Sequence, residues 1–271
     1  MTGDYRYKIR QRPKFLQSGA PYAALPLAFN EQRHELAVSV AFATDRKLFG
    51  EVYSCLQPDY FWDMPRRSGV FVRPVVQTSD LSRNHTKPGD IDLLIIPYEE
   101  GELILHRVLA VEIKIIRAKY ARQGKSPNDF GVSQATALRD MGFPYVGLLH
   151  LIVSDDSPEH AWQEVQRARV IDKKGTAEWL APARIDTMPM NLIHRAFGRL
   201  ESRQTWPELG LAAAYVLASS FCLQKGLGAS WQPQVSPAER NEMSLDLLSS
   251  VGEYFDANAS SFLDNPRFDP A

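Results

Sequence analysis

Three apolar runs of strand length constrain the fold of this chain more than any other feature. Two of them, 91–97 (IDLLIIP) and 145–153 (YVGLLHLIV), are nearly continuous, and the third, 107–115, is interrupted by charged residues. Short apolar runs bounded by turn residues are typical of buried strands. The turn sequence EEG at 99–101 separates 91–97 from 107–115. We therefore expect these two segments to pair as a hairpin.

The segments around these strands have helical or extended patterns. Apolar residues at helical spacing over 30–57 predict one or two helices, with Asp45 as the N-cap of the second. Residues 69–76 are rich in β-branched and aromatic residues and predict a further strand. The stretch 129–141 predicts a helix that ends at Gly142. The predicted order is thus helix, strand, strand, strand, helix, strand.

The two ends of the chain have a different character. Residues 1–28 are rich in proline and basic residues, which is typical of an irregular arm. From residue 155 onward the pattern predicts mostly helices, one beginning in 158–169, one over 208–224 and an amphipathic one over 237–255. No composition shift marks a sharp domain boundary.

Composition excludes several classes of protein. Hydrophobic residues make up 44% and charged residues 23% of the 271 positions, as in ordinary globular proteins. A net charge of −1 gives no sign of a general nucleic-acid coat, although local basic patches remain compatible with it. Two cysteines without CxxC spacing argue against a disulfide framework or a zinc site. The apolar stretch 211–223 is too short to span a bilayer. We expect a soluble cytoplasmic protein that does not enter a membrane.

The charged residues of the predicted hairpin carry the chemistry. Side chains alternate between the faces of a strand, so Glu112 and Lys114 point one way, while their apolar neighbours point into a core. Asp90 and Asp92 share a face of the neighbouring strand by the same rule. The hairpin is expected to bring both sets together as an acidic pocket with one ammonium group.

Such a pocket fits a hard divalent cation. Mg²⁺ takes carboxylate, carbonyl and water oxygens, and Mn²⁺ can substitute for it. Two carboxylates from adjacent strands, with the backbone carbonyl of Ile113, can hold one ion. A bound ion lowers the pKa of a water molecule and stabilises charge on a phosphate oxygen. Lys114 can orient that water or neutralise the developing charge. The sequence therefore predicts phosphodiester hydrolysis.

These residues resemble a known family. Gly89-Asp90-Ile91-Asp92-Leu93 followed by Val111-Glu112-Ile113-Lys114 is similar to the motif of the PD-(D/E)XK nuclease superfamily, including its restriction-endonuclease-like and Holliday-junction-resolvase-like members. The resemblance covers roughly residues 45–153. It implies an α/β fold with an αβββαβ core, in which a mixed central sheet is flanked by helices. Ile91 stands where the literal motif has proline.

The resemblance also implies roles for individual residues. Asp92 and Glu112 are the implied metal ligands, and Lys114 is the implied catalytic lysine. Family members often add an acidic residue from the helix before the first strand, for which Glu51 is our candidate and Glu35 the alternative. Asp90 occupies a position that is also open to a ligand.

Two further features complete the predicted site. Family members often place a glutamine on the helix after the ExK strand, and Gln134 stands there as a catalytic candidate. A basic run without intervening acids follows the strand, and beside a metal site it predicts a track for phosphates. Its members are Arg117, Lys119, Arg122 and Lys125. A solvated loop is the alternative interpretation of this run.

Together these observations predict a Mg²⁺-dependent nuclease, most readily a DNA endonuclease, in which a metal-activated water attacks phosphorus. The expected organisation is a basic arm at 1–28, a nuclease-like core at 29–154 and a mainly helical region at 155–271 packed on the core. DNA is expected rather than RNA, and the resemblance makes a homodimer an expectation. The alternatives are a nuclease-fold protein that binds nucleic acid without cleaving it, and a Mg²⁺-dependent hydrolase of small phosphoesters.

Overall fold

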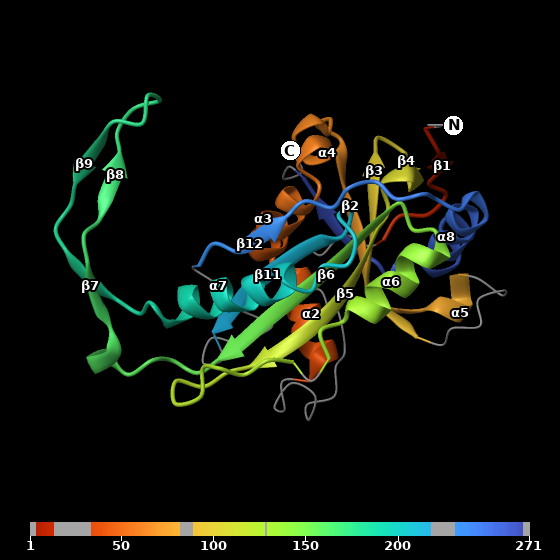
Figure 1. Cartoon of the computed structure of the whole chain (residues 1–271). Coiled ribbons are helices and arrows are strands. Elements are labelled where there is room, and N and C mark those ends of the chain that lie inside the picture. The colour runs from red at the N-terminus through yellow and green to blue at the C-terminus, as the bar shows by residue number, and fades with distance from the viewer. Residues whose placement is uncertain (1–3, 14–33, 82–88, 128, 218–230, 268–271) are drawn as a thin grey trace.

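A computed structural model describes residues 4–13, 34–81, 89–127, 129–217 and 231–267 of the chain. Within these residues the protein is an α/β structure with a mixed nine-stranded sheet and seven helices (Figure 1). None of the helices in the described part is long and apolar enough to cross a membrane.

The predicted N-terminal helices are confirmed as two consecutive helices. They are α2 (Glu35–Thr44) and α3 (Arg46–Leu56), and they meet at Asp45. The Asp45 carboxylate accepts hydrogen bonds from the backbone N–H groups of Lys47 and Leu48, so it caps α3 as predicted. A further short helix, α4 (Pro58–Asp63), begins with proline in its first turn, where the missing N–H costs nothing.

The predicted strands form the centre of the sheet. They are β2 (Ser68–Gln77), β3 (Asp90–Glu99), β5 (Leu109–Arg117) and β6 (Tyr145–Ser154). β3 runs antiparallel to both β2 and β5, and β5 runs parallel to β6. The direct hairpin partner of β3 is the short strand β4 (Glu102–Ile104), and a single 3-10 turn (Leu105–Arg107) leads from it into β5.

The helix α6 (Val132–Met141) connects β5 to β6. Gly142 ends it in a left-handed conformation, as the sequence predicted. A one-turn helix, α5 (Thr78–Leu81), begins the segment between β2 and β3 that was expected to be a loop, and the rest of that segment, 82–88, lies outside the described residues.

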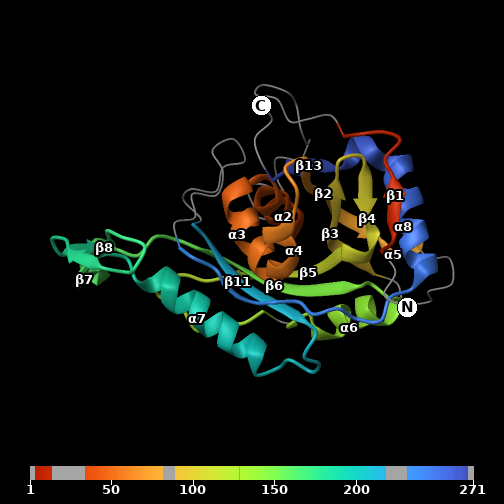
Figure 2. The same ribbon diagram turned by 90° about the horizontal axis from the view of Figure 1, so that it is seen from above.

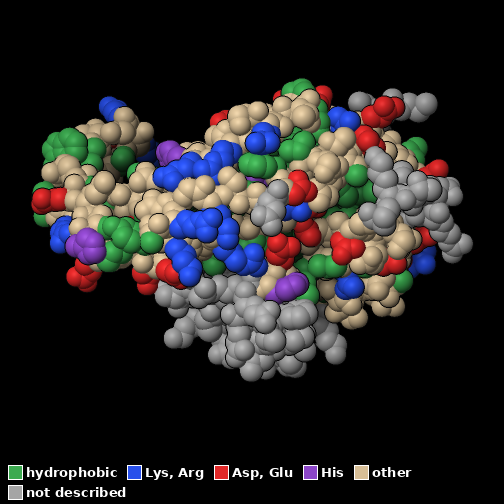
Figure 3. Space-filling model, turned by 60° about the horizontal axis from the view of Figure 1, so that its bottom comes forward, with side chains coloured by type: hydrophobic (Ala, Val, Ile, Leu, Met, Phe, Trp, Pro, Cys, Tyr) green, Lys and Arg blue, Asp and Glu red, His purple; other side chains and the backbone are tan. Residues whose placement is uncertain are grey.

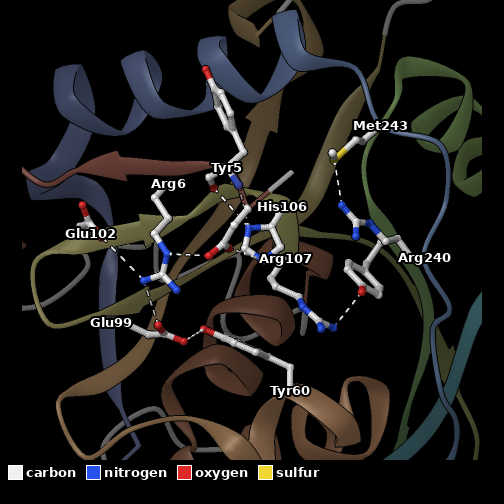
Figure 4. A network of polar contacts seen from close by, with 11 residues as sticks. Tyr5, Arg6, Tyr60, Glu99, Glu102, His106, Arg107, Arg240 and Met243 are labelled. Carbon is white, nitrogen blue, oxygen red and sulfur yellow. Dashed lines mark hydrogen bonds and ion pairs between the residues drawn. The ribbon is translucent and has the colours of Figure 1, made fainter. Parts of the chain in front are cut away.

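Residues 6–8 form an edge strand, although the sequence predicted an irregular arm there. This strand, β1 (Arg6–Lys8), pairs antiparallel with β4. Figure 4 shows the polar contacts that hold it in place: the Arg6 guanidinium lies 3.1 Å from both Asp4 and Glu99, and the Tyr60 hydroxyl donates to Glu99. These contacts tie the N-terminal segment to the end of the sheet where β3 finishes.

The C-terminal region is not mainly helical, contrary to the prediction. It contains two helices, two short 3-10 turns and seven strands among the described residues. They are the turn Glu159–Ala161, β7 (Gln163–Val165), β8 (Ala168–Val170), β9 (Ala177–Trp179), β10 (Ala183–Ile185), α7 (Met188–Glu201), β11 (Gly210–Leu217), β12 (Gln234–Ser236), α8 (Leu245–Asn258), a second turn Ala259–Ser261 and β13 (Leu263–Pro266).

The strand β11 shows why the helix prediction over 208–224 was wrong. Its sequence, GLAAAYVL, contains residues with high helix propensity, yet it pairs in parallel with β6 along its whole length. Its side chains are buried alternately in the clusters on the two faces of the sheet. Tertiary burial therefore overrides the local propensity of alanine, and 218–224 lie outside the described residues.

Helices cover both faces of the sheet (Figure 2). α2 and α3 pack on one face, and α6, α7 and α8 pack on the other. β13 extends the sheet beside β2, and β11 and β12 extend it beside β6. The strands that carry the predicted site thus lie in the interior of a two-faced core.

Candidate active site

The candidate site lies where β3 and β5 separate. Three residues of each strand pair with one another, and Leu93 with Val111 is the last of these pairs before the strands separate. One residue beyond Leu93, the Asp92 carboxylate accepts a hydrogen bond of 2.7 Å from the backbone N–H of Ile113, which is two residues beyond Val111. The Asp92 side chain thus takes the place of the next main-chain hydrogen bond between the strands. Its carboxylate lies where the two strands separate.

Glu112 and Lys114 point to the same face of β5, as the alternation predicted. The Lys114 ammonium lies 2.9 Å from the Glu112 carboxylate, whose side chain is only 5% exposed. Val111, Ile113 and Ile115 pack in the cluster on the opposite face. The charged face is also covered, so the strand is buried on both sides rather than on one.

Burial controls the charge of the two carboxyl groups. Burial, and after it the charge of the neighbouring Asp92 carboxylate, together raise the pKa of Glu112 to about 7, against the opposing effect of Lys114. Burial also raises the pKa of Asp92, although the Ile113 N–H and Lys114 oppose this rise. The two acids therefore form an interacting pair that holds a proton more tightly than isolated carboxyl groups do.

Lys114 keeps its charge in this setting. Burial alone lowers the pKa of the lysine, but contacts with Glu112, Asp92 and Asp129 outweigh it and raise that pKa. The ammonium group therefore remains protonated near neutral pH.

The loop before α6 packs against Glu112 and Lys114 and forms one wall of the site. Asp129 accepts a hydrogen bond from the backbone N–H of Gly131, which lowers the pKa of Asp129, and a hydrogen bond from Gln134 lowers it further. Gly131 has φ +84°, and a Cβ built there would lie 3.1 Å from both the Glu112 Cγ and the Lys114 Cε. Gln134 thus reaches the site through Asp129, the first residue of the stretch that the sequence predicted as a helix.

His150, on β6, contacts the loop that forms this wall. It pairs with Lys114 across β5 and β6, is fully buried, and its Nε2 lies 3.2 Å from the Phe130 carbonyl oxygen. Burial lowers the pKa of this imidazole to about 4, so the ring is neutral near pH 7. Its other ring nitrogen has no hydrogen-bond partner within the described residues.

Of the two candidate helix acids, Glu35 on α2 is the one whose charge acts on Asp92. Glu35, in the first turn of α2, raises the pKa of Asp92 by its charge. α2 lies over β2, β3 and β5, whereas α3, which carries Glu51, lies over β11 and β12. The structure therefore brings the alternative candidate Glu35 toward Asp92 and positions Glu51 over another part of the sheet.

Asp90 stands apart from the buried pair. It is exposed at the first residue of β3, opposite Gln77. Ile91 and Leu93 pack in clusters on different faces of the sheet, so the alternation that was expected to align Asp90 with Asp92 does not hold here. The backbone of Val75, which faces this point from β2, has φ +52°, an irregularity at the same level of the sheet.

The predicted basic run leaves the site at the end of β5. Arg117, Lys119, Arg122 and Lys125 are all exposed. The loop is fixed at its far end because the Arg199 guanidinium of α7 donates to the carbonyl oxygen of Lys125 and to the Ser126 hydroxyl. Figure 3 brings this end of the sheet forward and shows Lys and Arg side chains gathered beside a smaller group of acidic ones.

The metal-binding potential of the site rests on two carboxylates. Within the described ranges, no three His, Cys, Asp or Glu side chains converge closely enough to hold an ion together. Comparisons with family models, with curated proteins and with solved structures each gave no match. The geometry and chemistry of these side chains are therefore the basis for assigning a function.

Proposed function

We propose that this protein is a divalent-metal-dependent nuclease with a restriction-endonuclease-like core, and that its substrate is duplex DNA. The observation that carries the proposal is the pair of half-buried Asp92 and buried Glu112 where β3 and β5 separate, with the Lys114 ammonium 2.9 Å from Glu112. The family resemblance and the exposed basic loop after β5 give further support.

The donor set fits Mg²⁺. Asp92 and Glu112 offer carboxylate oxygens, and the Glu35 and Asp129 carboxylates add negative charge around them, against the positive charge of Lys114. Mg²⁺ commonly binds through one or two carboxylates and retains several water molecules, so two protein ligands suffice. A bound cation supplies an activated water and stabilises charge on the phosphate.

The residues of the chain then have separate tasks. Asp92 and Glu112 hold the cation, and the Ile113 N–H fixes the orientation of the Asp92 carboxylate. Lys114, held as an ammonium, donates a hydrogen bond to the attacking water or to a phosphate oxygen. Gln134 positions Asp129, which in turn faces Lys114. The basic loop from Arg117 to Lys125 binds the phosphates that flank the cleaved bond.

Cleavage of supercoiled plasmid in the presence and absence of Mg²⁺ tests this function. The wild-type protein should nick or linearise the plasmid only with the metal, and Glu112→Gln and Lys114→Ala should each lose cleavage by at least about a thousandfold. Glu201→Gln and Lys47→Ala, which change exposed residues of the same types, serve as matched controls and should cleave normally.

Three results would contradict the proposal. Normal turnover by both active-site variants excludes this site as the source of cleavage. Plasmid binding without cleavage, with either Mg²⁺ or Mn²⁺, favours the nuclease-fold binding protein. Hydrolysis of small phosphoesters without any cleavage of DNA favours the small-substrate hydrolase.

A further inference from the structure

The segment between β6 and α7 projects from the body of the protein as a narrow ribbon (Figure 1). It consists of two antiparallel pairs, β7 with β10 and β8 with β9, neither of which joins the main sheet. All of its paired residues are exposed or only partly buried. An isolated two-stranded ribbon is only marginally stable in water. The ribbon therefore contributes little to the stability of the fold. Its exposed surface makes it a candidate for binding another molecule.

The two faces of the outer pair differ. The register places Ala168 opposite Trp179 and Val170 opposite Ala177, so these four side chains share one face. Trp179 is 77% exposed, and Val170 is also exposed. The opposite face carries Arg169 and Glu178, which form an ion pair. An apolar face with an exposed tryptophan is therefore available at the outer end of the ribbon.

The ribbon is basic in a protein that is not. Residues 163–185 hold five basic and three acidic side chains, whereas the whole chain has a net charge of −1. Two of these acids are engaged locally: Glu178 pairs with Arg169, and Asp172 accepts hydrogen bonds from the backbone N–H groups of Lys174 and Thr176. Lys173 and Lys174 stand exposed at the tip, and neither forms an ion pair with any described residue.

The base of the ribbon adjoins the basic loop of the candidate site. The ring of His160, in the turn before β7, lies edge-on to the ring of Tyr120 at 6.3 Å between centroids. Tyr120 lies between Lys119 and Arg122. Basic residues therefore continue from Lys114 through this loop toward the ribbon.

We infer that the ribbon 163–185 is an arm that enters a groove of duplex DNA and holds the duplex beside the site at Lys114; this inference rests on the proposed function. A two-stranded antiparallel ribbon fits the major groove, and basic side chains beside it contact phosphates. Apolar side chains of a ribbon contact thymine methyl groups or wedge between base steps. Lys173 and Lys174 bind phosphates at the tip, and the Trp179 face contacts the groove.

Binding of a short labelled duplex in EDTA, measured at several salt concentrations, tests the arm without any cleavage. Lys173→Ala/Lys174→Ala should weaken binding by roughly tenfold at moderate salt and reduce the salt slope by about two, one for each lost phosphate contact. Trp179→Ala should weaken binding with little change in slope, because it removes no charge. Arg66→Ala/Arg67→Ala, an exposed basic pair in the turn between α4 and β2, is the matched control and should bind as the wild type does.

The outcomes separate the arm from the nuclease. If ribbon variants bind weakly and no protein cleaves DNA, the arm stands and the proposed catalytic function fails. If the wild type cleaves DNA and the ribbon variants bind the duplex as tightly as it does, the arm is overturned. Ribbon variants that bind the duplex like the wild type but differ from it in molar mass by light scattering also overturn the arm. That result identifies a second copy of the chain as the partner of the ribbon.

Discussion

The Asp92 carboxylate accepts a hydrogen bond of 2.7 Å from the backbone N–H of Ile113, just beyond Leu93 and Val111, the last paired positions of β3 and β5. This contact satisfies a main-chain donor at the point where the two strands separate. It also fixes one carboxylate beside Glu112 and Lys114. The relationship therefore links the local geometry of the sheet to the charge that the site presents.

Substitutions at Asp92 should separate these two contributions. An asparagine oxygen can still accept the Ile113 N–H, whereas alanine leaves that donor without its partner. We expect Asp92→Ala to be less stable than Asp92→Asn by about 1–3 kcal/mol. Both variants should lose metal-dependent cleavage, because both remove the charge. Urea unfolding in EDTA measures the difference in stability, and equal unfolding free energies would show that the hydrogen bond does not stabilise the fold.

The raised pKa of Glu112 predicts an unusual dependence of stability on pH. The folded protein holds this proton up to about pH 7, whereas an ordinary glutamic acid releases it near pH 4.5. Between these values the folded state binds more protons than the unfolded state, so stability falls as pH rises. Glu112→Gln should lack this loss, which is on the order of 3 kcal/mol.

Because His150 also changes stability with pH, the quantity to measure is the difference in unfolding free energy between the wild type and Glu112→Gln. Burial lowers the pKa of this residue to about 4, so it destabilises the fold as pH falls below the ordinary histidine value. This slope opposes that of Glu112 and is present in both the wild type and Glu112→Gln. The unfolding free energy of the variant minus that of the wild type should therefore increase from about pH 4.5 to 7. A constant difference would contradict the raised pKa.

Two helix acids should differ in their effect on metal affinity. Glu35 lies close enough to raise the pKa of Asp92 by its charge, and Glu51 lies on the helix over β11 and β12. We expect Glu35→Gln to weaken Mn²⁺ binding roughly threefold to tenfold, the size of a screened charge interaction near 1 kcal/mol. Glu51→Gln should leave the affinity unchanged. Calorimetric titration measures both, and the reverse order would assign the role to α3.

Gly131 tests the wall around Lys114. Alanine there must adopt φ +84° and also places a Cβ 3.1 Å from the Lys114 Cε and 2.8 Å from Leu148. Gly175 has the same φ but nothing within 4 Å of a built Cβ, so Gly175→Ala carries the backbone cost alone. Each should lose about 1 kcal/mol of stability from the backbone. Only Gly131→Ala should also weaken Mn²⁺ affinity, and equal metal affinities in the two variants would contradict the proposed wall.

The central strands and the ExK side chains could be predicted because their signals are local. Alternation within β5 orients Glu112 and Lys114 together, and the Asp45 carboxylate caps α3 through neighbouring residues. Neither feature depends on contacts between residues that are far apart in the sequence.

The remaining features depend on tertiary contacts that no local pattern encodes. The alanine-rich strand β11 is extended because it pairs with β6 and is buried on both faces. The choice between Glu35 and Glu51 depends on which helix lies over β3, and the role of Asp129 depends on how its loop folds against Lys114. The sequence predicted a helix beginning in 158–169, and this was wrong because the short strands there pair with later strands of the same ribbon.

The location of a bound divalent ion tests the central claim most directly. Crystals of the protein soaked with Mn²⁺ and measured by anomalous diffraction should show a peak between the carboxylates of Asp92 and Glu112, at carboxylate–metal distances of about 2.0–2.3 Å. The same peak should be absent from Asp92→Asn crystals. A Mn²⁺ peak elsewhere in the molecule, or carboxylates that stay bound to Ile113 and Lys114 without any ion between them, would contradict the account.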